Sequence, residues 1–205
     1  MFAFAMRRIV AGLCMIVLAG PALADDKDPK AAEKAIDLKV GDKAPAFKLR
    51  TDRDATWTLA DRIGKKWIVI YFYPGDFTPG CMAQARAFRD AMNKLTDLGV
   101  EVVGVSGDSI RIHEQFRKDQ KLNFTLLSDE DGAVAKAFGV PVAKGATVKA
   151  KDADGKPFEF ERASTAARWT FIVGKDGKIA YKNIKVFPAD DAKKITEFIS
   201  NAEKK

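Results

Sequence analysis

Histidine and cysteine, the side chains that most often bind transition metals, are scarce in this sequence. It has one histidine and two cysteines among 205 residues, whereas a zinc site takes three or four protein ligands. The single histidine, His113, lies between Arg111 and Glu114, which predicts a solvated residue on the polar side of a helix. We therefore expect no metal site and no cysteine–histidine hydrolase, and the sequence indicates no cofactor.

Long apolar runs are absent after residue 24, so this part of the chain predicts no membrane span. Residues 1–24 are typical of a secretory signal, with two arginines before an apolar run (residues 9–18) and an Ala-Leu-Ala cleavage site at residues 22–24. The run is shorter than the roughly 20 residues that a membrane anchor needs. We predict ordinary secretion to the periplasm, with no membrane contact after cleavage and with Cys14 removed.

Positive charge is not concentrated in any one stretch of the chain. The formal net charge is +7, and the lysines are spread along the sequence. A nucleic-acid-binding face would gather them, so we predict a solvated surface and no nucleic-acid partner. Residues 25–35 predict a flexible polar leader, and residues 36–205 are long enough for one well-buried domain.

Apolar runs and amphipathic stretches alternate along that domain. Residues 67–73 (WIVIYFY) are typical of a strand buried on both faces. A helix with an apolar residue every three or four positions follows and ends at Gly99, and residues 101–106 predict a second, parallel strand. The other expected elements are an opening hairpin (47–49 and 56–58), helices (109–120 and 189–202), a strand (124–127), a short helix ending at 139, an inserted hairpin (142–167) and a closing hairpin (168–173 and 178–182). This order predicts a thioredoxin-like α/β sandwich with a central mixed sheet flanked by helices.

Cys81 remains after the predicted cleavage and lies in the first turn of a predicted helix. Thr78 is placed to cap that helix, with its side-chain oxygen accepting from the backbone N–H three residues on. Pro79 falls at the first helical position, where its missing N–H costs nothing. Unpaired N–H groups and the helix dipole favour a thiolate at this end. The pattern predicts a reactive sulfur, against the alternative of an inert core cysteine.

The residues around Cys81 resemble the peroxidatic signature of the peroxiredoxins. The pattern is Pro74-x-x-x-Thr78-x-x-Cys81 within YFYPGDFTPGCMAQARAFRD. Residues 123–131 (NFTLLSDED) resemble more narrowly the Q-type, or bacterioferritin-comigratory-protein, branch. Arg168, before a WTFIV strand, resembles the family's active-site arginine. The resemblance implies a thioredoxin-like fold and a thiol peroxidase without a cofactor.

The resemblance also implies roles for individual residues. Cys81 is expected to attack one peroxide oxygen and become a sulfenic acid. Thr78, with the hydrogen of its capping hydroxyl left free, and Arg168 are expected to polarise the peroxide, while Pro74 shields the sulfur. The residues expected to line or frame the substrate pocket are Gly80, Tyr73, Gln84 and Arg89.

A second, resolving cysteine is missing from the family pattern. In many Q-type relatives it lies five residues after the nucleophile, where this chain has Arg86, and in another subset it lies where this chain has Ala135. We therefore predict a one-cysteine mechanism, in which an external thiol or a thioredoxin-like protein reduces oxidised Cys81. The alternatives are a redox sensor or a thiol–disulfide exchange protein that acts by a mixed disulfide, although Gln84 stands where a Cys-x-x-Cys motif needs its second cysteine. Both a monomer and a homodimer are compatible with the sequence.

Overall fold

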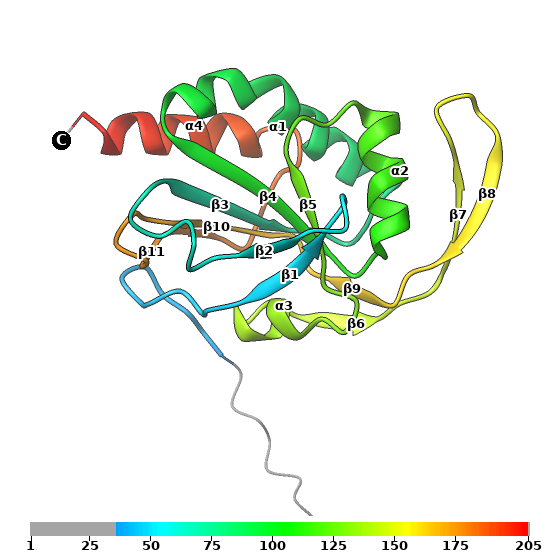
Figure 1. The fold of residues 1–205 in the computed structure, drawn as a ribbon, viewed down its shortest axis with the longest axis horizontal. Coiled ribbons are helices and arrows are strands. Elements are labelled where there is room, and N and C mark those ends of the chain that lie inside the picture. Colours follow the sequence, from blue (N-terminus) through cyan, green and yellow to red (C-terminus); the bar gives the residue numbers. More distant parts are fainter. Residues whose placement is uncertain (1–35, 205) are drawn as a thin grey trace, which may run out of the picture. The chain divides into compact units, whose positions relative to one another are not determined.

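Seven strands form one mixed sheet in the computed structural model, which describes residues 36–204. The strand order is β11-β10-β3-β4-β5-β1-β2 (Figure 1). The parallel strands at its centre are β3 (Trp67–Phe72), β4 (Val100–Ser106) and β5 (Thr125–Ser128). The antiparallel strands at its edges are β10 (Trp169–Val173) and β11 (Ile179–Asn183) on one side, and β1 (Lys48–Thr51) and β2 (Thr56–Thr58) on the other. The predicted mixed sheet is confirmed, with a hairpin at each edge.

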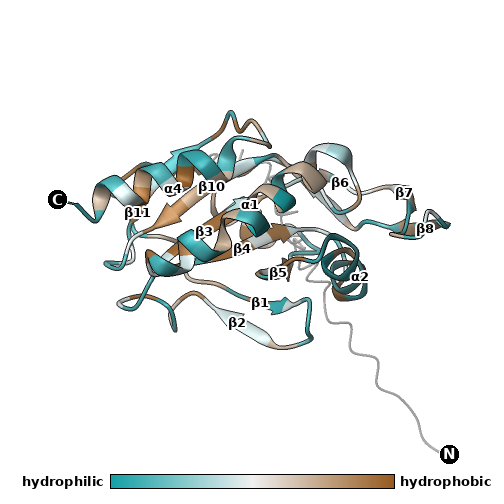
Figure 2. Ribbon diagram, turned by 90° about the horizontal axis from the view of Figure 1, so that it is seen from above, coloured by the Kyte–Doolittle hydropathy of each residue, from teal (hydrophilic) through white to brown (hydrophobic). Residues whose placement is uncertain are grey.

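Helices cover both faces of this sheet. The four helices among the described residues are α1 (Pro79–Asp97), α2 (Ile110–Gln120), α3 (Ala133–Ala137) and α4 (Asp191–Ala202). Figure 2 shows α1 and α4 side by side over the central strands, with their polar residues turned outward. α3 packs on the opposite face. This arrangement confirms the thioredoxin-like sandwich that the order of elements predicts.

The alternation of side chains along β3 supplies the core on both faces. Ile68, Ile70 and Phe72 join the cluster on the α3 side, whereas Val69 and Tyr71 join the cluster under α1, α2 and α4. Side chains alternate along a strand, so a continuous apolar run requires cover on both faces. The packing under α1 places the start of that helix directly against the core.

An insertion of two ribbons lies between α3 and β10. Its base pairs β6 (Val142–Lys144) with β9 (Ser164–Ala166), and its outer part pairs β7 (Thr147–Lys151) with β8 (Pro157–Glu161). Neither pair joins the main sheet. The outer ribbon projects on the side of α2 in Figure 1. The predicted inserted hairpin is therefore confirmed, with two ribbons in place of one.

The predicted signal and leader, residues 1–35, lie outside the described residues. Among residues 36–204, no helix combines the length and apolar character that crossing a membrane requires.

Candidate active site

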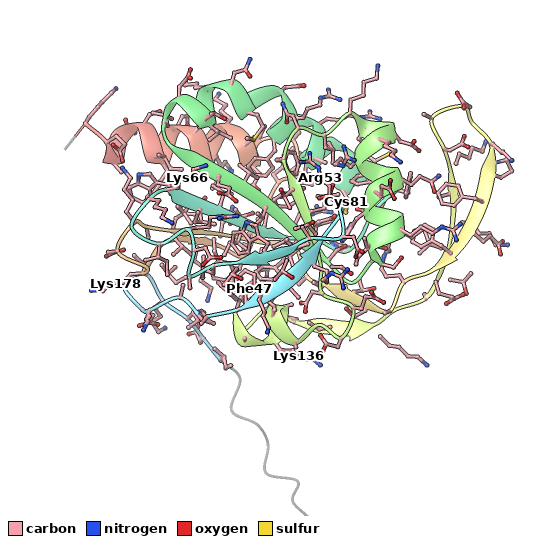
Figure 3. All side chains as sticks on the ribbon, in the orientation of Figure 1. Phe47, Arg53, Lys66, Cys81, Lys136 and Lys178 are labelled. Atoms are coloured by element: carbon pink, nitrogen blue, oxygen red, sulfur yellow. The ribbon has the colours of Figure 1, made fainter. Side chains whose placement is uncertain are left out.

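The start of α1 carries Cys81 into the interior of the fold. The chain leaves β3 at Phe72 and enters α1 at Pro79, which occupies the first helical position as predicted. Cys81 is only 1% exposed and belongs to the same buried cluster as Tyr71 and Ala85. Figure 3 shows it inside the fold, near the ends of the central strands. The sulfur therefore lies where backbone N–H groups without helical partners and a low dielectric both act on it.

Thr78 occupies the N-cap position, but its side chain does not cap the helix as predicted. Its hydroxyl instead donates to the carbonyl oxygen of Gly75, 3.2 Å away. The loop allows this because Gly75 and Phe77 adopt φ values of +151° and +59°, which turn the chain back towards Thr78. The prediction of a free hydroxyl hydrogen is wrong, and the lone pairs of the oxygen are what remain available.

Arg168, just before β10, reaches the sulfur directly. Its Nη2 donates to Cys81 Sγ at 3.1 Å, and its Nη1 donates to Gln84 Oε1. Gly80 lies below the same guanidinium, since a Cβ on it would be 3.4 Å from Arg168 Nη2. The structure thus brings together Cys81, Arg168, Gly80 and Gln84, four of the residues that the sequence singles out. A guanidinium at this distance favours a thiolate and can hold a second oxygen ligand in its fork.

A buried carboxylate behind Gln84 is absent from the sequence-based prediction. Asp191, the first residue of α4, accepts from Gln84 Nε2 and from the Thr170 hydroxyl, each at 2.7 Å. Burial raises the pKa of the Asp191 carboxyl, and these two hydrogen bonds and the Arg168 charge offset the rise only in part. No local pattern marks Asp191, because its partners come from α1 and β10.

Tyr73, predicted to line the substrate pocket, directs its hydroxyl elsewhere. It is 1% exposed, and its hydroxyl donates to Asp76 Oδ1 at 2.7 Å. Pro74, which follows it, is half-buried at the start of the loop. Arg89, predicted to frame the site, donates instead to the Gln120 carbonyl at the end of α2. Tyr73 and Pro74 both lie in the loop that leads to Cys81, and Arg89 lies further along α1.

His113 is fully buried, so the prediction of a solvated histidine is wrong. Its Nδ1 lies 2.7 Å from Asp76 Oδ2 and its Nε2 lies 3.2 Å from the Leu127 carbonyl. Burial lowers the pKa of His113, but the Asp76 carboxylate, with Asp108 and the Leu127 carbonyl, more than offsets this, so the pKa lies above its ordinary value. Burial raises the pKa of Asp76 in turn. His113 lies on the buried face of α2 with Ile112, Phe116 and Gln120, whereas Arg111 and Lys118 are exposed. This buried face turns towards the loop that carries Asp76.

A second buried carboxylate, Asp108, ties the same loop to the insertion. It accepts from the backbone N–H of Asp76 and from the Ser106 hydroxyl, each at 2.8 Å. Arg162 donates to Asp108 Oδ1 at 2.8 Å and to the Asp76 carbonyl at 2.9 Å. Ligand atoms of Asp76, Asp108 and His113 lie within 4.8 Å of one another, yet protein groups bind the oxygens of both carboxylates. We interpret this cluster as structural.

The outer ribbon of the insertion packs on the loop through aromatic rings. Phe77 makes edge contacts with Phe116 of α2 and with Phe158 and Phe160 of β8, at centroid distances of 5.2, 5.0 and 6.1 Å. These contacts compensate for the left-handed backbone of Phe77, which is unfavourable for a residue with a Cβ. The insertion therefore helps to hold the loop before Cys81.

Known proteins resemble this chain over most of its length. The profile of the AhpC/TSA family matches residues 40–182. A putative peroxiredoxin bcp of Coxiella burnetii is 40% identical over 143 residues, which are 70% of this chain and 86% of that protein. The chloroplastic peroxiredoxin Q of Oryza sativa subsp. japonica is 39% identical over 141 residues, 69% of this chain and 57% of the relative.

Solved structures with a similar fold point to the same group. Peroxidoxin BcpB of Mycobacterium tuberculosis has a TM-score of 0.66 at 26% identity, over 80% of this chain and 98% of that one. The bacterioferritin comigratory protein of Xanthomonas campestris, described for its alkyl peroxide reduction activity, has a TM-score of 0.62 at 29% identity, over 76% of this chain and 91% of that one.

Proposed function

The chain belongs to the AhpC/TSA family, among peroxiredoxins of the Q and bacterioferritin-comigratory type, and we propose that its peroxidase chemistry runs on Cys81 alone. Peroxiredoxins are thiol peroxidases, so the protein is an oxidoreductase that uses a peroxide and a thiol reductant. The observation that carries the assignment of Cys81 is the 3.1 Å contact of its sulfur with Arg168 Nη2. A positive guanidinium beside a sulfur at a helix N-terminus favours the nucleophilic thiolate.

In the first step the peroxide is reduced and Cys81 is oxidised. The thiolate attacks one oxygen of a hydroperoxide, and a sulfur–oxygen bond forms as the oxygen–oxygen bond breaks. The electron pair of the broken bond leaves with the other oxygen, which takes a proton and departs as water or an alcohol. Cys81 is left as a sulfenic acid.

The groups around the sulfur are placed to stabilise this step. Arg168 can donate to the peroxide as well as to Sγ, because its guanidinium has five N–H groups. The backbone N–H groups of Gly80 and Cys81 lie in the first turn, where they have no helical carbonyl partner, and can bind the departing oxygen. Thr78 donates to Gly75, so its lone pairs can accept from a peroxide O–H. Pro74 contributes no N–H that would compete for the thiolate.

The second half of the cycle needs a thiol from outside the domain. Cys81 is the only cysteine among residues 36–204, and the two places where relatives carry a resolving cysteine hold other groups. Arg86 donates to Gln120, and Ala135 is buried in α3. One external thiol condenses with the sulfenic acid to a mixed disulfide and releases water. A second thiol then frees Cys81 and leaves as a disulfide with the first.

Burial of the sulfur favours peroxidase chemistry over a pure thiol–disulfide exchange role. A sulfur that is 1% exposed is reached more readily by hydrogen peroxide or a small organic hydroperoxide than by a protein disulfide. The alkyl peroxide reduction described for the Xanthomonas protein supports organic hydroperoxides as one substrate class. The reductant we propose is a small thiol or a thioredoxin-like protein, and a protein reductant needs the start of α1 to open around Cys81 after its oxidation.

The site of action proposed from residues 1–24 is the periplasm. The motifs in those residues support export, with cleavage after Ala24. N-terminal mass analysis of the protein recovered from the periplasmic fraction tests this. A chain that begins at Asp25 is expected, and full-length protein retained in the cytoplasm would contradict it.

Stopped-flow mixing of the reduced protein with hydrogen peroxide tests the proposed function. Peroxide should be consumed orders of magnitude faster than by a free thiol, one equivalent per Cys81, and Cys81→Ser should abolish the reaction. Turnover should continue only when an excess of thiol is supplied. A single fast oxidation without turnover under any dithiol or thioredoxin-like reductant would indicate a sensor instead.

A further inference from the structure

A row of hydrogen bonds runs from α4 to the sulfur across three elements. Asp191 Oδ2 accepts from Gln84 Nε2 at 2.7 Å, Gln84 Oε1 accepts from Arg168 Nη1, and Arg168 Nη2 donates to Cys81 Sγ at 3.1 Å. Building on the proposed function, we propose that Asp191 is a positioning residue, which fixes the amide of Gln84 and through it the guanidinium of Arg168 beside Cys81.

The orientation of the Gln84 amide follows from the chemistry of its two partners. An ionised carboxylate only accepts hydrogen bonds, and a guanidinium only donates them. The NH₂ group of Gln84 must therefore face Asp191 and its oxygen must face Arg168. Gln84 is fully buried, so water cannot supply hydrogen bonds that would stabilise the flipped amide.

The amide oxygen in turn determines which nitrogen of the Arg168 guanidinium faces the sulfur. With Nη1 bound to Gln84, Nη2 is the nitrogen that points at the sulfur. Arg168 is only partly buried, so a guanidinium without this anchor could rotate towards solvent and lose the sulfur. A displacement of about 1 Å at a reacting centre can cost on the order of 100-fold in rate.

Burying the Asp191 carboxylate costs free energy, and packing alone does not explain why a charged residue stands there. The side chain is buried, and its Oδ1 has no hydrogen-bond partner among the described residues, while Oδ2 also accepts from Thr170. Burial raises the pKa of this carboxyl. Four ionisable groups interact electrostatically with Asp191, and they are Arg168, Lys194, Tyr71 and Tyr181. Arg168 is the one among them that contacts the sulfur, which places the function of the buried charge in the active site.

Asp191→Asn tests the proposal because it keeps the shape and removes the charge. An asparagine can donate as well as accept, so the Gln84 amide is no longer fixed. Single-turnover oxidation by hydrogen peroxide is expected to slow at least tenfold at neutral pH. The ratio of the parent rate to the Asp191→Asn rate should shrink as the pH falls, because Asp191 of the parent protein then takes up a proton and loses its charge. Asp190→Asn, one residue earlier and exposed, is the matched control and should leave the rate unchanged.

A double variant distinguishes positioning from a general loss of structure. Gln84→Glu alone places two carboxylates together and should slow the reaction. Gln84→Glu combined with Asp191→Asn moves the negative charge from position 191 to position 84. The carboxylate introduced at position 84 can accept both from Arg168 and from the amide introduced at position 191. The pair should recover most of the lost rate. A double variant no faster than Asp191→Asn would overturn the proposal.

Side-chain ¹⁵N NMR of Arg168 gives a readout that does not depend on peroxidase activity. Its guanidinium resonances should shift and broaden in Asp191→Asn and stay in place in Asp190→Asn. A cooperative thermal unfolding transition in each variant shows that both proteins are folded. Unchanged Arg168 resonances in Asp191→Asn would overturn the positioning role even in a fast peroxidase. Failure of the proposed function shows separately, as slow oxidation of the parent protein.

Discussion

The guanidinium of Arg162 lies so close to Gly75 that a Cβ on Gly75 would be 2.0 Å from Arg162 Cζ. Gly75 lies in the loop that leads to Cys81, and Arg162 follows the β7–β8 ribbon of the insertion. The contact therefore joins a segment outside the main sheet to the loop that precedes Cys81. It also gives the insertion a role that its sequence alone does not indicate.

Gly75→Ala should disrupt both the loop and the Arg162 contact. The backbone strain of an alanine at φ +151° costs about 1–3 kcal/mol, and the new methyl group must also displace a buried guanidinium. We expect a lower unfolding midpoint and slower oxidation by peroxide. Gly64→Ala is the control, because Gly64 also has a positive φ (+82°) but has no atom within 4 Å of an added Cβ. Equal effects of the two changes on both measurements would contradict the contact.

Arg162→Met should destabilise the fold by leaving Asp108 buried without its cation. Arg162 is 8% exposed and Asp108 is fully buried, and removal of one partner of a buried pair costs about 3 kcal/mol or more. Chemical denaturation measures this loss. Lys149→Met removes the exposed Lys149–Glu159 pair of the same ribbon and should leave the unfolding midpoint nearly unchanged. A similar small effect of both changes would show that the Asp108 pair contributes little.

Arg168→Met should slow the reaction of Cys81 with hydrogen peroxide by about 100-fold. The change removes the donor at Sγ and a donor to the oxygen–oxygen bond, and keeps an apolar stem of similar length. Stopped-flow kinetics gives the rate, and the ultraviolet absorbance of the thiolate gives its population. Arg53→Met, in the exposed turn between β1 and β2, is the control. Rates and absorbance equal to those of the parent protein would exclude Arg168 from the chemistry.

His113→Gln should flatten the dependence of stability on pH. Asp76 raises the pKa of buried His113 above its ordinary value of 6.5, so the folded protein binds this proton more tightly than the unfolded chain does. The resulting stability is fully present below that ordinary pKa and is lost as pH rises through the raised one. The raised pKa of Asp76 likewise makes stability fall as pH rises, but in a lower pH range. Denaturation midpoints measured from weakly acid to weakly alkaline pH should converge for parent and variant, and parallel profiles would contradict this.

Local patterns were enough to predict that Cys81 lies in the first turn of a helix. A threonine at the N-cap position, a proline at the first helical position and a cysteine in the first turn indicate the start of α1 without reference to the rest of the chain. The period of apolar residues likewise predicted the buried strands and the order of helices, because burial on one or two faces leaves its period in the sequence.

The directions of individual hydrogen bonds were not predictable in this way. Thr78 was expected to accept from the helix and instead donates to Gly75, because the loop turns back through two residues with positive φ. His113 was expected in solvent because it lies between charged Arg111 and Glu114, yet it belongs to the buried face of α2 and meets the buried carboxylate of Asp76.

The sequence by itself placed Cys81 in the first turn of a helix, left no second cysteine after residue 24 and predicted the layered α/β fold, since each follows from neighbouring residues or from a regular spacing. Only the tertiary structure decided which distant groups surround the Cys81 sulfur. Asp191 meets Gln84 because α4 packs beside α1, and Arg162 meets Gly75 because the insertion folds back onto the loop. Such contacts join residues far apart along the chain, and their geometry is set by how whole elements pack rather than by any local pattern.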